Sequence, residues 1–305
     1  MKRAAGACAA CLLLAAAQAG AAAADDLIGA PSYAVVDPRQ TLLDIARDHD
    51  VGYVDIRLAN PDVDPWLPDG GRVIAIPSQH VLPPGARRGI VINLAELRLY
   101  FYPPGGEPLS FPIGIGREGA ETPVGHTRID RKRENPSWVP TASEREEDPE
   151  LPLSVGPGPL NPMGEFALYL GWAGFAIHGT HQPYSVGRRG SHGCIRLYPE
   201  DIARLYPLVD AGTPVSVIDL PYKLGWRAGE LYVEVHPVQR EADRVEMGEM
   251  PLPDPTLDLV APILEALGAE AYRVDWRQVE RAQREQNGMP LAVTRRQAPT
   301  SIGRQ

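Results

Sequence analysis

Two short stretches of this 305-residue chain combine residue types that can do covalent chemistry. One runs Ser191-His192-Gly193-Cys194-Ile195-Arg196-Leu197, and the other, Ile177-His178-Gly179-Thr180, lies a short way upstream. A thiol, histidines close to it in sequence, and glycines that let a ligand approach the backbone are the ingredients of a cysteine nucleophile. We therefore predict that Cys194 is a nucleophile.

A cysteine attacks as its thiolate, and a free thiol with a pKa near ~8.5 is mostly protonated at neutral pH. His192, two residues before Cys194, shares its face of an extended backbone, whereas His178 ends an apolar strand and precedes a glycine. The residues alone leave the choice between these two bases open. Arg196 can favour the thiolate or hold a substrate carboxylate, and the N–H groups of Gly193 and Cys194 can face a tetrahedral oxyanion. The pattern predicts acyl transfer through a thioester.

Two other chemistries fit the same sequence less well. Zinc could be bound by histidine and cysteine at acceptable spacing, but no second cysteine or obvious carboxylate joins the group. The candidate zinc ligands are His178, His181, His192 and Cys194. A dinucleotide fingerprint, Gly114-x-Gly116-x-x-Gly119, follows a strand candidate, but Thr122-Pro123-Val124-Gly125 stands where the helix is required. We expect no metal, no cofactor and no bound nucleotide.

Residues 1–24 are typical of an export signal. Two basic residues precede a mostly apolar run that ends at Ala19, and small residues continue to Ala24, so cleavage after either alanine fits. The run is too short and too rich in alanine for a membrane span. A lipoprotein-type cysteine is the alternative, but neither Cys8 nor Cys11 has a leucine three residues before it.

Removal of that segment leaves Cys194 as the last cysteine and changes the net charge from −9 to −11. Exported thiols usually pair as disulfides, so an unpaired cysteine in a polar loop indicates reactivity rather than burial in a core. An acidic exported chain without basic runs is a poor partner for nucleic acid or an anionic membrane. We expect neither partner.

Residues 32–78 are predicted to form a small α+β unit. Its expected order is a strand from Tyr33, a helix opened by the capping box Thr41-Leu42-Leu43-Asp44, a helix over Val54–Ala59, and a strand over Arg72–Ile76. The unit resembles a LysM module, which binds the N-acetylglucosamine backbone of cell-wall glycans. The matching residues are Tyr33-x-Val35, Thr41-Leu42-x-x-Ile45-Ala46, Asn60, and Leu67-x-x-Gly70 before Ile74-x-Ile76-Pro77. Arg39-Gln40 replaces the usual Gly-Asp, and a spacer without a ligand is the alternative.

Beyond a stiff Pro83-Pro84-Gly85 linker the pattern becomes alternating. Residues 90–94 and 97–102 predict a β-hairpin with one buried face. Further strands are expected at 109–115, 126–130, 166–170, 175–178, 215–218 and 231–235. Pro199–Val209 is the best helix signal, and Arg131–Glu147 is interpreted as a solvated loop, with a lid over the site as the alternative. Residues 88–220 are therefore expected to be a mainly β catalytic domain, a curved sheet or sandwich.

Residues 221–305 are interpreted as a C-terminal extension without a catalytic constellation. Lys223–Trp226 and Leu231–His236 are expected to complete or brace the catalytic sheet. Helical spacing covers 257–267 and 274–286, and Pro290–Gln305 is interpreted as a frayed tail. His236 is expected to be structural.

Residues 88–220 resemble the YkuD-type L,D-transpeptidase family, whose signature matches 178–180 and 191–197. The resemblance implies that Cys194 attacks the L,D peptide bond between diaminopimelate and D-Ala in a peptidoglycan tetrapeptide stem. D-Ala then leaves, and an amine resolves the acyl-enzyme. The resemblance also implies that His178 is the acid/base. The implied substrate-binding set is Gly179, Thr180, Ser191, His192, Gly193 and Arg196.

The hairpin at 92–100 and the segment Pro112–Arg117 resemble the proteobacterial branch that has an N-terminal LysM module, which implies a periplasmic protein. In that branch the acceptor is an outer-membrane lipoprotein lysine, a diaminopimelate amine or water, and one sequence does not reveal which. Hydrolysis by a carboxypeptidase or a lipoprotein-detaching amidase is one alternative. A non-catalytic peptidoglycan-binding protein is the other.

Overall fold

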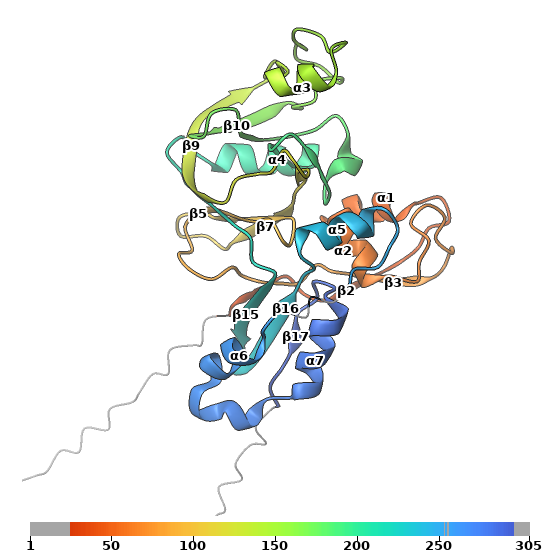
Figure 1. Cartoon of the computed structure of the whole chain (residues 1–305), viewed down its shortest axis with the longest axis vertical. Helices are drawn as coiled ribbons and strands as arrows, with labels where there is room; N and C mark the ends of the chain where they lie inside the picture. The colour runs from red at the N-terminus through yellow and green to blue at the C-terminus, as the bar shows by residue number, and fades with distance from the viewer. Residues whose placement is uncertain (1–24, 253, 255, 296–305) are drawn as a thin grey trace, which may run out of the picture.

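The computed structural model describes residues 25–252, 254 and 256–295 (Figure 1). Its largest element is an eight-stranded sheet with the order β13-β11-β10-β9-β14-β5-β6-β7. Neighbouring strands are antiparallel except in the pairs β14–β5 and β11–β13. The strands are β5 (Gly89–Asn93), β6 (Arg98–Tyr102), β7 (Leu109–Pro112), β9 (Gly125–Glu134), β10 (Phe166–Leu170), β11 (Ala176–His178), β13 (Ile195–Arg196) and β14 (Pro214–Ile218). The mainly β prediction for this region is confirmed.

Both faces of the β5–β6 hairpin are buried, so the prediction of a single buried face is wrong. Ile90 and Leu99 belong to the main core, whereas Val91 and Tyr100 belong to a second cluster. Leu82, which precedes the hairpin, packs in that second cluster. The second face is covered by chain from outside the catalytic sheet, which no alternation inside the hairpin could indicate.

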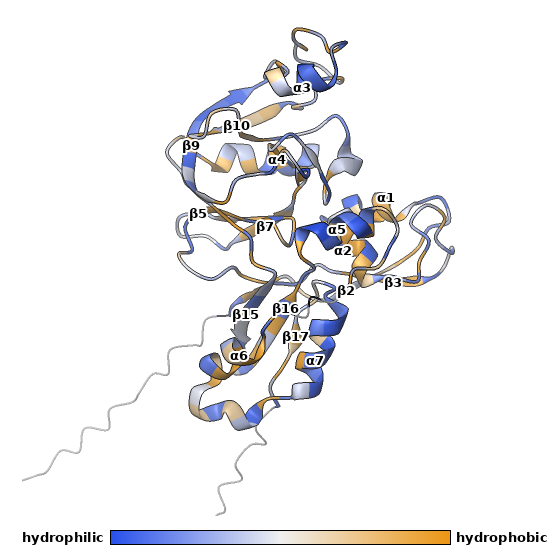
Figure 2. Ribbon diagram, in the orientation of Figure 1, coloured by the Kyte–Doolittle hydropathy of each residue, from blue (hydrophilic) through white to orange (hydrophobic). Residues whose placement is uncertain are grey.

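Three other elements differ from their predicted form. The strand predicted at 109–115 is divided, because its end, β8 (Ile115–Gly116), pairs with β12 (Arg189–Ser191) in a separate two-stranded sheet. The charged stretch predicted as a loop instead contains the end of β9 and a helix, α3 (Ala142–Glu147). Figure 2 shows β9 and α3 as mostly hydrophilic. The predicted helix from Pro199 is present as α4 (Pro199–Leu205), continued by a 3₁₀ turn over Tyr206–Leu208.

The N-terminal unit has the predicted strand-helix-helix-strand order. It comprises β2 (Ser32–Val35), α1 (Leu42–Asp48), α2 (Tyr53–Ala59) and β3 (Val73–Ile76), and β2 pairs antiparallel with β3. The predicted capping box is present, because the Thr41 hydroxyl accepts the Asp44 N–H and the Asp44 carboxylate accepts the Thr41 N–H. A separate apolar cluster that includes Leu42, Ile56 and Ile74 fills the unit.

The C-terminal region forms its own sheet instead of completing the catalytic one. β15 (Tyr222–Arg227), β16 (Glu230–Val235) and β17 (Leu291–Ala292) are its three strands, and α6 (Val260–Leu267) and α7 (Trp276–Glu285) are the two predicted helices. Leu231, Ile263 and Val279 share one apolar cluster there. The frayed tail therefore does not begin at Pro290, because Leu291 pairs with Val233. The rest of the predicted tail, from 296 onward, lies outside the described residues.

A helix that the sequence analysis missed joins the units. α5 (Gln239–Glu246) lies beside α2, and its Ala242 and Val245 enter the main core together with Val54 and Leu58 of α2 (Figure 1). The side chain of Glu246 accepts the Arg189 N–H at 2.8 Å. The N-terminal unit and the catalytic sheet thus share part of one core.

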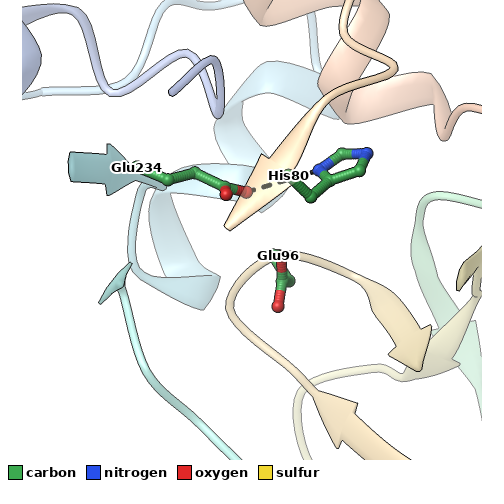
Figure 3. A group of neighbouring side chains, drawn as sticks. All are labelled: His80, Glu96 and Glu234. Carbon is green, nitrogen blue, oxygen red and sulfur yellow. Dashed lines mark hydrogen bonds and ion pairs between the residues drawn. The ribbon is translucent and has the colours of Figure 1, made fainter. Parts of the chain in front are cut away.

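A buried charged cluster lies where three parts of the chain meet (Figure 3). His80 comes from β4 (His80–Val81), Glu96 from the hairpin loop, and Glu234 from β16. Their ligand atoms lie within 4.8 Å of one another, a spacing that a metal ion could use. The Lys223 ammonium already occupies this place, because it pairs with Glu96 and lies 3.2 Å from Glu234. His236 Nε2 lies 2.8 Å from the same Glu234 carboxylate, consistent with the structural role expected for His236.

Within the described residues, no helix is both long and apolar enough to cross a bilayer. The predicted export signal over 1–24, with Cys8 and Cys11, lies outside the described residues.

Candidate active site

The pairing of β11 with β13 brings the two predicted catalytic stretches together. The strands are parallel, with Ile177 opposite Ile195 and His178 opposite Arg196. Because side chains alternate along a strand, His178 and Arg196 share one face of the sheet, and Cys194, two residues before Arg196, belongs to that face. The isoleucines point the other way and are buried in the main core.

A cavity of about 380 Å³ lies over that face. Cys194, His178, Ser191, His192 and Arg196 all line it. Residues from neighbouring strands and loops complete its wall, notably Arg131, Trp138, Glu144, Met163, Tyr169 and Ala176. A cavity of this size with a few converging polar groups is typical of a small-molecule or peptide site.

Cys194 is half-buried and reaches this cavity as a neutral thiol. Its sulfur donates to the Gly174 carbonyl at 3.6 Å. Burial raises the pKa of the thiol, and the Glu144 charge adds to the rise, whereas a hydrogen bond from the backbone at Ala176 and the Arg196 charge oppose it. The resting thiol is therefore not a preformed thiolate, and a base must take its proton when it attacks.

His178 is suited to that task because it is neutral. The ring is buried, and burial, with the Arg196 charge as the second cause, lowers its pKa to about 4. Nδ1 lies 2.5 Å from the Gly179 carbonyl oxygen. A carbonyl can only accept, so Nδ1 carries the hydrogen, and in the neutral ring Nε2 is left with a lone pair.

A tight turn presents the cysteine. The Ser191 hydroxyl donates to the Cys194 carbonyl at 2.6 Å and accepts the Gly193 N–H at 3.1 Å. Gly193 has φ of +99°, and a Cβ there would lie 2.6 Å from the Phe175 ring. Both facts require glycine. Because its N–H is taken by Ser191, Gly193 does not supply the oxyanion donor that we expected; the Cys194 N–H has no acceptor among the described residues.

Two glycines of the three-glycine string, Gly114 and Gly116, contact the cysteine stretch. Gly114 exchanges two backbone hydrogen bonds with Arg196, at 2.8 and 2.9 Å. The Thr122 hydroxyl accepts the Gly116 N–H and donates to the Gly193 carbonyl at 2.9 Å. A Cβ on Gly116 would lie 2.1 Å from a backbone oxygen. Gly114 and Gly116 therefore help to hold the cysteine turn in place.

His192 binds α3 and its neighbourhood. Its Nδ1 lies 3.3 Å from Glu144 and its Nε2 lies 3.0 Å from Glu147, which also pairs with Arg117. The end of the charged stretch thus closes over the cavity, and Trp138 and Glu144 line it. The interpretation as a solvated loop is wrong for these residues, and the alternative of a covering segment is favoured.

The other predicted site residues lie elsewhere. Gly179, Thr180 and Gly193 do not line the cavity; Thr180 and His181 border a separate groove, where the Thr180 hydroxyl accepts the Gln182 N–H. The four candidate zinc ligands are not gathered at ligand distance, because the sole cluster of that kind in the described part of the chain is His80, Glu96 and Glu234.

Sequence reasoning missed the far wall of the cavity. Arg131 and Tyr169 are cross-strand partners, and the guanidinium lies 3.6 Å from the ring centroid. Met163 and Trp138 pack with Tyr169 and Cys194 in a small cluster. The available signal was a tyrosine inside one predicted strand and an arginine directly after another, and their pairing can be recognised only when the strand register is known.

Sequence comparisons with known proteins identify one family. The sequence profile of the L,D-transpeptidase catalytic domain (YkuD) matches residues 87–217. The chain is 39% identical over 279 residues to the "Probable L,D-transpeptidase ErfK/SrfK" of Salmonella typhimurium, covering 88% of each sequence. It is 38% identical to the "Probable L,D-transpeptidase YcfS" of Escherichia coli, covering 89% of this chain and 86% of the relative. A solved L,D-transpeptidase from Mycobacterium smegmatis is 24% identical, with a TM-score of 0.35 over 50% of this chain and 71% of that one.

Proposed function

The chain belongs to the L,D-transpeptidase family, and on that premise we propose that it opens peptidoglycan tetrapeptide stems through a thioester on Cys194. The observation that carries the proposal is the common cavity of Cys194 and His178, which come from paired strands in a fixed register. A neutral imidazole with its Nδ1 hydrogen held by a carbonyl is a base, not an acid, in the resting enzyme. This favours His178 over His192, whose two nitrogens face carboxylates of the covering segment.

The first half-reaction transfers the acyl group to sulfur. His178 Nε2 takes the thiol proton as the sulfur attacks the diaminopimelate carbonyl carbon, which forms the C–S bond. The resulting oxyanion is stabilised by the free N–H of Cys194. The C–N bond to D-Ala then breaks, and the proton on His178 passes to the departing amine. Arg196, without an ion pair among the described residues, binds the D-Ala carboxylate.

The second half-reaction returns the enzyme to its starting state. An amine attacks the thioester carbonyl and gives its proton to His178 Nε2. The new C–N bond forms, the C–S bond breaks, and the proton returns to the sulfur. Water in place of the amine would give the carboxypeptidase or amidase outcome, and a lipoprotein lysine or a diaminopimelate amine gives a crosslink. We propose transfer to an amine as the main outcome, with hydrolysis as the alternative.

Export and wall binding complete the proposal. We propose that residues 1–24 direct the chain to the periplasm and that residues 32–78 act as a LysM-like module on glycan strands. The order of strands and helices and the capping box of the N-terminal unit support its assignment as a LysM-like module. The unit also shares part of a core with the catalytic sheet. The module would hold the enzyme on its polymeric substrate.

Mass spectrometry of muropeptides after incubation with sacculi, with and without lipoprotein, tests the function directly. Release of D-Ala with formation of a new amide is expected from the parent protein. Cys194→Ala should abolish turnover, and His178→Ala should lower it by about 10²-fold or more. A parent protein that neither releases D-Ala nor becomes acylated at Cys194 by a carbapenem would support the non-catalytic alternative instead. A His178→Ala rate near that of the parent would remove His178 from the mechanism.

A further inference from the structure

The cavity holds a second guanidinium that the chemistry at Cys194 does not use. Arg131 stands on β9, and its guanidinium lies 3.6 Å from the centroid of the Tyr169 ring. The two residues are partners in the β9–β10 register, and both line the cavity. Stacking on an aromatic face fixes the plane of a guanidinium and leaves its N–H edges free for a ligand.

No protein carboxylate neutralises this group. Within the described part of the chain, Arg131 forms no ion pair, and its side chain forms no hydrogen bond. Glu144, the acidic residue that lines the same cavity, has its carboxylate engaged elsewhere. It accepts the Thr141 N–H at 2.7 Å and lies 3.3 Å from His192 Nδ1. Arg131 is therefore an exposed cation that stacks on Tyr169 and keeps its N–H groups available to a ligand that enters the cavity.

The sheet register sets how far this cation stands from the nucleophile. Ile195 pairs with Ile177, so Cys194 lies beside Ala176 on the next strand. Ala176 pairs with Tyr169, and Tyr169 pairs with Arg131 on β9. Three strand spacings of about 4.8 Å place the Arg131 backbone about 14 Å from that of Cys194. Arg196, in contrast, is two residues from Cys194, about 7 Å along the strand. The cavity has one cation near the reacting bond and a second one across the sheet.

We propose that Arg131, held against Tyr169, binds a second carboxylate of the acyl donor, on the side of the stem away from the leaving D-Ala. The inference rests on the proposed function and specifies its substrate class: a donor with free carboxylates on both sides of the scissile bond. Paired N–H···O bonds between guanidinium and carboxylate would fix the orientation of the stem as well as its affinity. Two groups have this chemistry, the side-chain carboxyl of diaminopimelate and the free carboxyl of the acidic residue before it.

The test compares Arg131→Met and Arg131→Lys with a matched control, Arg133→Met. Arg133 is on the same strand, two residues along, and is exposed like Arg131, but it is not part of the cavity wall. Three donors are used: the unmodified stem, a stem with the diaminopimelate carboxyl amidated, and a stem with the preceding carboxyl amidated. D-Ala release gives kcat/KM, and calorimetry in the Cys194→Ala background gives Kd without turnover.

For the unmodified donor, Arg131→Met should lower kcat/KM and weaken binding roughly 10-fold, with Arg131→Lys between it and the parent and Arg133→Met unchanged. Amidation of the carboxyl that Arg131 binds should lower kcat/KM and affinity of the parent by the same roughly 10-fold. It should cause no further decrease in Arg131→Met. The donor that shows this loss of additivity identifies the carboxyl.

Two results would overturn the inference. One is that the losses in kcat/KM from Arg131→Met and from amidation multiply for both amidated donors. The other is that Arg133→Met lowers kcat/KM as much as Arg131→Met does. Stems that bind in the Arg131-dependent way but never lose D-Ala would refute the proposed function and leave the carboxylate site standing.

Discussion

In the proposed mechanism the ionisation of His178 sets the acid limit of the reaction, and one substitution should move that limit. Burial and the Arg196 charge lower the pKa of His178 from 6.5 to about 4. That fall of about 2.5 pH units corresponds to about 3 kcal/mol against the imidazolium. A base works only when unprotonated, so Cys194 acylation in the parent should stay constant down to about pH 5 and fall through pH ~4. An ordinary histidine would place that fall near 6.5.

Arg196→Met removes a like charge from beside the imidazolium and should raise the pKa of His178. Burial is the larger of the two causes, so the pKa should rise by about one pH unit or less. The acid limb of the pH–rate profile should then lie between about pH 4 and 5. Methionine keeps much of the side-chain volume, and the loss of a guanidinium without an ion pair leaves no buried anion behind.

The assay is the second-order rate of Cys194 acylation by a carbapenem, followed by intact-protein mass from pH 3.5 to 8. It reports the free enzyme and does not depend on the acceptor. Arg131→Met is the matched control, because that guanidinium is not a cause of the His178 shift, and its limb should coincide with that of the parent. A parent limb near pH 6.5, or a limb that moves to lower pH in Arg196→Met, would refute the electrostatic reasoning.

Three further predictions concern stability and the cysteine turn. Lys223→Met should lower the free energy of unfolding by about 3–5 kcal/mol, because it leaves two buried carboxylates without their cation. The control Arg39→Met removes one partner of an exposed ion pair and should change that free energy by less than about 1 kcal/mol. Equal effects of the two variants in urea denaturation would contradict this prediction. Gly193→Ala should lower the rate of Cys194 acylation by at least about 10-fold. Gly193 has φ of +99° and a Cβ there would lie 2.6 Å from the Phe175 ring, so the turn must shift to hold alanine. An unchanged rate would show that the turn tolerates a Cβ atom. Thr41→Ala should cost about 1 kcal/mol through loss of the α1 cap, read by thermal unfolding, and a stable variant would show that the cap contributes nothing.

Local elements were well predicted where their signal is contained in adjacent residues. The Thr41 capping box, the β5–β6 hairpin and the helix from Pro199 are set by cap chemistry, alternation and a first-turn proline, and all three are present. The loop assignment of the charged stretch failed because β9 continues past Asp130 by pairing with β10, a distant partner that tolerates an exposed face. The same reason explains the missed β17, which exists only through its pairing with β16.

The sequence by itself supplied the reactive groups on which the proposal depends: one thiol in a glycine-containing turn, two candidate bases, and an arginine two residues on. Tertiary structure decided that His178 is buried while His192 faces Glu144 and Glu147, that the Gly193 N–H is bonded to Ser191, and that Arg131 stands on the far wall of the cavity. Those outcomes depend on burial and strand register, which are set by contacts between residues far apart in the chain. The identity of a side chain is local, but its protonation state and its neighbours are not.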